Sequence, residues 1–229
     1  MQLTFASYNI HKAVGLDRKR DPERILRVLR EVDADIVALQ ECDMRFGERE
    51  SVIPRALIDD TKWRAVDVAK RPRSIGWHGN ALLVRRDIDC VEAHPLDLPT
   101  LEPRGAAMAE LKFGGKRFRV IGTHLDLSGL RRRDQVRALI GHCEGGKACP
   151  TVIMGDFNQW GTQSGAMREF GKGWQQVPLG ASFPARRPVA RLDRIIVTAD
   201  WKVHGAMAHH SALSAQASDH LPVSVRLTI

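Results

Sequence analysis

Apolar segments that end in acidic, amide or imidazole side chains recur along this chain, and they constrain its fold more than any other feature. In the clearest case, Val152-Ile153-Met154 runs into Gly155-Asp156-Phe157-Asn158. Asp156 and Asn158 stand two residues apart, which is the side-chain period of an extended chain, so both can point into the same space. An Asx turn that ends a strand is the simpler interpretation of these two residues taken alone.

The same pattern occurs at four other places. Residues 36–39 precede Gln40-Glu41, residues 120–122 precede Thr123-His124, residues 5–8 precede Asn9, and Ser218-Asp219-His220 opens the last apolar segment. Strands with such ends predict that several sheet edges converge on one polar pocket, for which the rest of the chain is the scaffold.

Length and composition indicate a single domain over residues 1–229. The strand signals run through the chain without a linker-like break, and 229 residues can bury a substantial core without disulfides. Lys and Arg number 35 against 27 Asp and Glu, which gives a formal charge of +8. This excess favours polyanionic partners but does not separate nucleic acid from an anionic membrane surface. Nothing fixes the oligomeric state, for which a monomer is the default expectation.

The cysteine spacing and the chain start bear on cellular location. Cysteines at positions 42, 90, 143 and 149 form no CxxC pair and indicate reduced thiols. The first residues lack the basic and apolar regions of a signal peptide, and no apolar run reaches the ~20 residues that span a bilayer. We therefore expect a cytoplasmic protein without a transmembrane segment.

Two long segments have helical periodicity. Asp21-Pro22 is typical of a helix start, and apolar residues then recur at helical spacing up to Val32. A second helix is expected from Ser128 to Cys143, with an arginine-rich face at 131–137 that fits either a polyanion or solvent.

Strand signals outnumber the helical ones. Strands are expected at residues 3–10, 35–40, 63–69, 81–84, 90–94, 106–113, 117–122, 151–154, 193–198, 203–209 and 221–228. Too few helices separate them for an all-parallel doubly wound sheet. An α/β fold of two packed mixed β-sheets flanked by helices fits better.

Asp219-His220 offers acid–base chemistry. Histidine is the usual proton donor or acceptor near neutral pH, but it needs a partner that fixes its tautomer. Asp193 can hold the imidazole while Asp219 faces a metal. A capped turn before Pro222 is the alternative for Asp219.

Glu41 ends a strand with the composition of a buried one, and an unpaired buried carboxylate is costly. Arg45 can supply a structural cation, whereas Mg²⁺ would supply a functional one, because hard divalent ions take one or two carboxylates and keep several waters. Asn9 can complete such a shell. His124 can donate to a phosphate oxygen, protonate a leaving group or serve only structure, and Arg104 can neutralise a phosphate.

Six short motifs occur in a fixed order along the chain. They are Tyr8-Asn9-Ile10, Leu39-Gln40-Glu41, Thr123-His124-Leu125, Gly155-Asp156-Phe157-Asn158, Leu192-Asp193-Arg194-Ile195 and Ser218-Asp219-His220-Leu221-Pro222. In this order they resemble the endonuclease/exonuclease/phosphatase superfamily, which includes DNase I-like enzymes. Each motif is unspecific alone, but the ordered set is specific and covers nearly the whole chain.

The resemblance implies a four-layer α/β sandwich and Mg²⁺- or Mn²⁺-dependent phosphoester hydrolysis, with a phosphodiester or nucleic acid as the leading substrate. By analogy, Glu41 is the principal metal ligand, with Asn9 and Asp219 close to the metal. Asp156 would orient or deprotonate the attacking water, and Asn158 would bind the phosphoryl oxygen.

The resemblance also implies that His220 and Asp193 form the catalytic pair. It does not settle whether His220 or Asp156 takes the proton. His124 falls where DNase-like and lipid-cleaving members have histidine. Asn80 and Arg104 lie where relatives place substrate-facing residues.

Two other functions remain open at this point. One is a phospholipid or inositol-lipid hydrolase that works on anionic phospholipid at a membrane surface. The other is a catalytically inactive polyanion-binding module on the same fold. The presence of all the expected acids, amides and histidines favours an enzyme.

Overall fold

The computed structural model describes residues 1–44, 47–99 and 105–229, and it contains two mixed β-sheets of six strands each. In spatial order, the first sheet consists of β11 (Lys202–Ala208), β12 (Val223–Thr228), β1 (Gln2–Asn9), β2 (Ile36–Gln40), β4 (Ala81–Arg85) and β3 (Trp63–Ala65). The second consists of β5 (Asp89–Asp97), β6 (Gly105–Phe113), β7 (Lys116–His124), β8 (Thr151–Asp156), β10 (Asp193–Thr198) and β9 (Trp174–Gln176).

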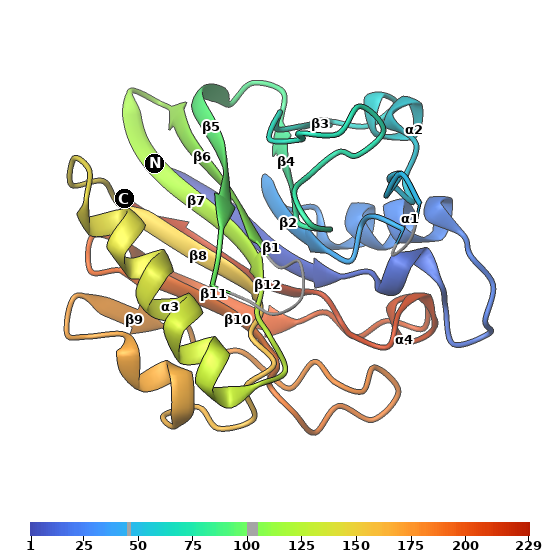
Figure 1. Cartoon of the computed structure of the whole chain (residues 1–229). Helices are drawn as coiled ribbons and strands as arrows, with labels where there is room; N and C mark the ends of the chain where they lie inside the picture. Colours follow the sequence, from blue (N-terminus) through green and yellow to red (C-terminus); the bar gives the residue numbers. More distant parts are fainter. Residues whose placement is uncertain (45–46, 100–104) are drawn as a thin grey trace.

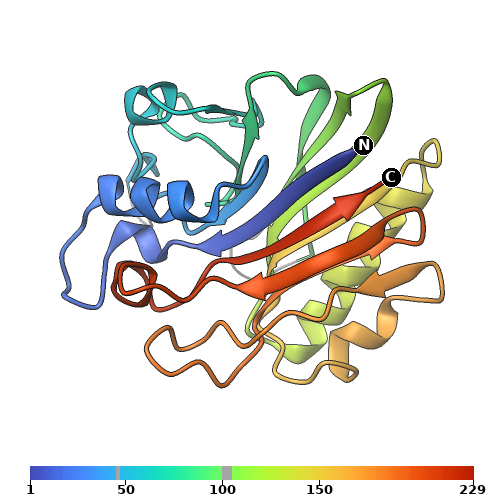
Figure 2. The same ribbon diagram turned by 180° about the vertical axis from the view of Figure 1, so that it is seen from behind.

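The helical segments are few and lie outside the pair of sheets (Figure 1). In the described part of the chain they are α1 (Pro22–Val32), α2 (Arg55–Asp59), α3 (Gly129–Glu144), α4 (Ser214–Ala217) and the two short 3₁₀ segments η1 (His11–Ala13) and η2 (Gly165–Glu169). Seen from behind, α1 and α2 cover one sheet and α3 covers the other (Figure 2). The expected four-layer α/β sandwich is therefore confirmed.

The two sheets meet through a hydrophobic core on their inner faces, which includes Phe5, Ala38 and Val120. Their approach is close at Gly122 in β7, where an added Cβ would lie 3.0 Å from the Cβ of Ala38 and 3.1 Å from Leu82. Small residues at this crossing let the backbones of the two sheets come together, and so bring their polar strand ends into one region.

The outer faces are covered by the two predicted long helices. In α1, the Asp21 side chain accepts a hydrogen bond from the Arg24 amide at 2.8 Å, as the cap and the following Pro22 predict. The aliphatic stripe of α1 packs on the first sheet, and Val136 and Leu139 of α3 pack on the second. None of the helices within the described ranges has the length and hydrophobicity needed to cross a membrane.

The strand directions explain why the polar residues gather at one edge. β1 and β2 run parallel, as do β7 and β8, so each pair of strands has its carboxyl ends together. β12, β10 and β4 run antiparallel to these neighbours and begin where they end. The carboxyl ends of four strands and the starts of three therefore share one side of the sandwich.

Some predicted boundaries were wrong. The strand expected over 63–69 ends at Ala65, although the Val66 amide still donates to the Leu82 carbonyl at 2.8 Å. The last strand begins at Val223 and not at 221, after Pro222, which has no amide hydrogen to donate. Neither β9 nor α4 was expected, because three residues of β9 and four of α4 are too few to establish a period.

Candidate functional site

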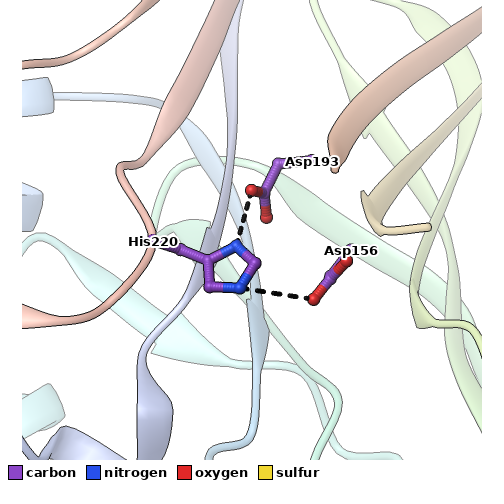
Figure 3. A group of neighbouring side chains, drawn as sticks. All are labelled: Asp156, Asp193 and His220. Atoms are coloured by element: carbon purple, nitrogen blue, oxygen red, sulfur yellow. Dashed lines mark hydrogen bonds and ion pairs between the residues drawn. The ribbon is translucent and has the colours of Figure 1, made fainter. Parts of the chain in front are cut away.

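The centre of the candidate site is a buried Asp193–His220–Asp156 cluster (Figure 3). Nδ1 of His220 lies 2.8 Å from Oδ2 of Asp193, at hydrogen-bonding distance, while Nε2 lies 3.7 Å from Oδ2 of Asp156. Asp193 is the first residue of β10, and Asp156 is the last residue of β8, directly opposite in the register. The expected pairing of His220 with Asp193 is present in the structure.

The environment of His220 favours its cationic form. Burial alone would lower the pKa of the imidazole, but Asp193, with smaller contributions from Asp156 and Asp219, raises the pKa to about 10. The ring also packs against Phe183, with centroids 4.9 Å apart. Oδ2 of Asp193 accepts a second hydrogen bond from the Ser182 hydroxyl, which fixes the carboxylate.

Asp156 connects this cluster to the first sheet. Its Oδ2 accepts a hydrogen bond from Nδ2 of Asn9 at 3.1 Å and lies 3.4 Å from Nε2 of His124. Its Oδ1 accepts from the Asn158 amide at 2.9 Å. Asp156 is 1% exposed, and hydrogen bonds to both carboxylate oxygens fix its orientation.

A glycine in β8 allows the strand to reach this position. An added Cβ on Gly155 would lie 1.8 Å from the Thr123 carbonyl oxygen of β7, and its φ is +158°. Only glycine therefore fits between β7 and the carboxylate that follows. The close approach brings His124 and Asp156 opposite one another in the parallel register.

Glu41 follows β2 and meets a cation. Its φ is +56°, and Nζ of Lys12 contacts its carboxylate. Burial alone would raise the pKa of Glu41, but His124, Lys12 and His11 together hold it below the usual value. Glu41 is therefore ionised, and its side chain keeps 24% exposure, so an ion can reach it.

Asn9 and Asp219 belong to the strand end that neighbours the one bearing Glu41. The hydroxyl of Ser218 donates to the Asn9 carbonyl at 2.7 Å, which places Asp219 at the end of β1. Asn9 pairs in register with Gln40, the neighbour of Glu41. His11 is near both carboxylates, since its Nδ1 lies 3.9 Å from Oδ1 of Asp219 and the residue contributes to the lowered pKa of Glu41.

The donor set suits a hard divalent cation. Glu41, Asn9 and Asp219 offer carboxylate and amide oxygens, which are the ligands that Mg²⁺ and Mn²⁺ prefer. Asp156, Asp193 and His220 form a second group that can hold a metal, with ligand atoms within 4.8 Å of one another. In that group, however, Oδ2 of Asp193 and Nδ1 of His220 already bond each other.

The remaining predicted residues differ in their placement. Asn158 has φ +49° and donates from Nδ2 to the Leu125 carbonyl at 2.9 Å, so one of its amide hydrogens is already used. Asn80 is fully buried and donates to the Gly105 carbonyl at 2.9 Å, an arrangement that ties β4 to β6 and does not present the amide to solvent. Arg104 and Arg45 lie outside the described residues.

Sequence reasoning missed the residues that support the site. Lys12 is a cation seen on Glu41, and η1 holds it there with φ values of +45°, +55° and +59° at His11, Lys12 and Ala13. Three successive left-handed residues are costly for non-glycine side chains. The signal was the polar His11-Lys12 pair, which begins two residues after Asn9. Nothing in the sequence marked Ser182.

Comparison with known proteins gives the family. The model of the endonuclease/exonuclease/phosphatase family matches residues 6–220. The uncharacterized protein YbhP of Escherichia coli K12 is 26% identical over 245 residues, which cover 96% of this chain and 93% of that protein.

Solved structures show the same fold. An endonuclease/exonuclease/phosphatase from Bacteroides vulgatus superposes with a TM-score of 0.80 at 18% identity, covering 100% of this chain and 99% of that one. A mannosyl-6-phosphatase from Bacteroides thetaiotaomicron superposes with a TM-score of 0.75 at 22% identity, covering 99% and 100%. The chain belongs to the endonuclease/exonuclease/phosphatase family.

Proposed function

We propose that this protein is a divalent-metal-dependent phosphoester hydrolase that acts on phosphodiesters. The observation that carries the proposal is the buried contact of His220 with Asp193 on one side and its approach to Asp156 on the other. Family membership supports hydrolysis of a phosphoester. The choice of a diester rests on the resemblance of the ordered motifs to DNase I-like enzymes.

His220 acts as a donor to the phosphoryl oxygen. Its Nδ1 is engaged by Asp193, so the second N–H points toward Asp156. The 3.7 Å between Nε2 and Oδ2 of Asp156 is too long for a direct hydrogen bond. An oxygen atom of the substrate can accept from Nε2 there, and the raised pKa of His220 supplies the positive charge that stabilises it.

Asp156 positions the attacking water and accepts its proton. Oδ1 is fixed by the Asn158 amide, and Oδ2 is held by Asn9, so the water approaches a carboxylate of set direction. His124, 3.4 Å from Oδ2, donates to the leaving-group oxygen or to a second phosphoryl oxygen. Asn158 supplies its remaining amide hydrogen to the phosphoryl group.

Glu41, Asn9 and Asp219 would hold the Mg²⁺ or Mn²⁺ ion. When bound, the ion stabilises the charge on the phosphoryl oxygen and on the leaving alkoxide. Nζ of Lys12 contacts Oε2 of Glu41, so an ion held by this carboxylate would compete with the ammonium for Oε2 or would take Oε1.

The test is hydrolysis of bis-p-nitrophenyl phosphate with Mg²⁺ or Mn²⁺, with and without chelator. His220→Ala and Asp156→Ala should each fold normally and lose at least about 10²-fold in kcat. His204→Ala, an exposed histidine on β11, is the matched control and should keep full activity. Activity near that of the natural protein in both site variants, or in excess chelator, would remove these residues or the metal from the mechanism.

A further inference from the structure

Exposed apolar side chains gather on the loops that carry the site. Among the described residues, the four most exposed large hydrophobic side chains are Leu127 at 73%, Leu130 at 74%, Trp160 at 66% and Val189 at 73%. The two others in this class, Val91 at 43% and Met207 at 54%, lie on the edge strands β5 and β11. Single exposed apolar residues are ordinary, but four at one edge of a molecule require a reason.

Each of the four lies within six residues of a residue of the proposed site along the chain. Leu127 lies in the connection from His124 to α3, Leu130 lies in the first turn of α3, and Trp160 comes two residues after Asn158. Val189 lies between Phe183, whose ring packs on His220, and the start of β10. We call the segments 125–133, 157–164 and 183–191 the rim loops.

Hydrogen bonds join two of the rim loops. Nη1 of Arg132 donates to the Leu127 carbonyl at 2.6 Å and to the Asp126 carbonyl at 3.1 Å, while its Nε donates to Oε1 of Gln159 at 3.3 Å. Nδ2 of Asn158 adds a bond to the Leu125 carbonyl at 2.9 Å. The loops that bear Leu127 and Trp160 are therefore held together next to Asp156, and the third is fixed where the Ala185 amide donates to the Asp219 carbonyl at 2.8 Å.

The apolar side chains are accompanied by positive charge. Arg131, Arg132 and Arg133 follow Leu130 without an intervening acid, and Arg186, Arg187 and Arg191 flank Val189. The last three are exposed. The three rim loops contain six arginines and one acidic residue, Asp126. A surface that is apolar and predominantly basic complements an anionic bilayer, in which arginines meet headgroups while leucine, valine and tryptophan enter the interface.

We propose that the rim loops dock on the surface of an anionic phospholipid bilayer and place the site against lipid headgroups. The inference rests on the proposed function and deepens it, since the phosphoester is then one carried by a membrane lipid. Single-stranded nucleic acid is less suited to this surface. Its bases stack on aromatic rings, whereas three of the four exposed apolar side chains here are aliphatic.

The experiment measures binding to vesicles in the presence of chelator, so that no turnover is needed. Vesicles of phosphatidylcholine with phosphatidylglycerol are compared with vesicles of phosphatidylcholine alone, by flotation. The natural protein should float with the anionic vesicles only. Leu127→Ser/Leu130→Ser should weaken this partition on the order of tenfold or more, because it removes two side chains that enter the interface. Val91→Ser/Met207→Ser, which changes two exposed apolar residues elsewhere, should leave the partition unchanged.

A second readout places Trp160 in the bilayer. Brominated phosphatidylglycerol should quench tryptophan fluorescence of the natural protein more than that of Trp160→Phe. Equal partition of the two double variants, or no difference in quenching, would overturn the proposal. Loss of single-stranded DNA binding in Trp160→Phe, with vesicle partition unaffected in Leu127→Ser/Leu130→Ser, would assign the surface to nucleic acid and overturn it as well.

Hydrolysis of soluble bis-p-nitrophenyl phosphate keeps this inference separate from the proposed function. Leu127→Ser/Leu130→Ser should hydrolyse the soluble diester at the rate of the natural protein. Vesicle binding without any diester hydrolysis would contradict the proposed function alone, and diester hydrolysis without vesicle binding would contradict the docking surface alone.

Discussion

Replacing Asp193 by asparagine removes one charge and almost no volume from the centre of the site. The carboxylate is fully buried and accepts hydrogen bonds from His220 and Ser182 through the same oxygen. It is the largest of the charges that hold the pKa of His220 at about 10. Each unit of pKa lost costs the imidazolium about 1.4 kcal/mol, and an asparagine can also present its NH₂ group to Nδ1 and turn the ring.

We therefore expect Asp193→Asn to lower kcat for bis-p-nitrophenyl phosphate by about 10²–10⁴-fold. The pKa of His220, followed by NMR in the metal-free protein, should fall by more than about one unit. Asp87→Asn is the matched control, because it removes a carboxylate whose partner Arg85 lies in an exposed ion pair. A folded Asp193→Asn protein with kcat within twofold of the natural value and an unchanged pKa at His220 would refute this account of the pair.

Three further predictions concern stability and metal binding. Gly155→Ala should destabilise the fold by at least about 2 kcal/mol in urea, since its Cβ would meet the Thr123 carbonyl at 1.8 Å; a loss below 0.5 kcal/mol would disprove that clash. Lys12→Met should raise Mn²⁺ affinity several-fold in calorimetry, because it removes a cation that competes for Glu41; weaker binding would instead make the lysine a support of the site. Because the pKa of His220 is raised in the folded protein, its protonation stabilises the metal-free fold fully below pH 6.5. This contribution to the free energy of unfolding is lost as pH rises through about 10. Unfolding free energies that do not decline over that range would contradict the raised pKa.

Most of the fold, and most of the residues that gather at the candidate site, could be predicted from the ordered motifs. Both depend on strand ends, which the sequence marks with transitions from apolar to polar residues. The long helices α1 and α3 were predictable from their periodicity. The boundary at Ala65 was not predictable from the sequence. The end of β3 is set by its pairing with β4, and not by the local preference of its residues for a strand.

The supporting contacts were less accessible to sequence reasoning. Lys12 reaches Glu41 through a turn with left-handed backbone conformation. Neither lysine nor glutamate predicts that conformation. Asn80 matched a substrate-facing position, and its Nδ2 donates within the fold to the Gly105 carbonyl of the neighbouring sheet. Both depend on contacts between distant segments, which local patterns do not encode.

The most direct measurement of the central claim is the position of Mn²⁺ by anomalous scattering from a crystal soaked with the ion. We expect an ion coordinated by the carboxylate of Glu41, with Asn9 and Asp219 around it and the Asp193–His220 hydrogen bond intact. An ion held between Asp156, Asp193 and His220, with that hydrogen bond broken and Glu41 still paired with Lys12, would contradict it.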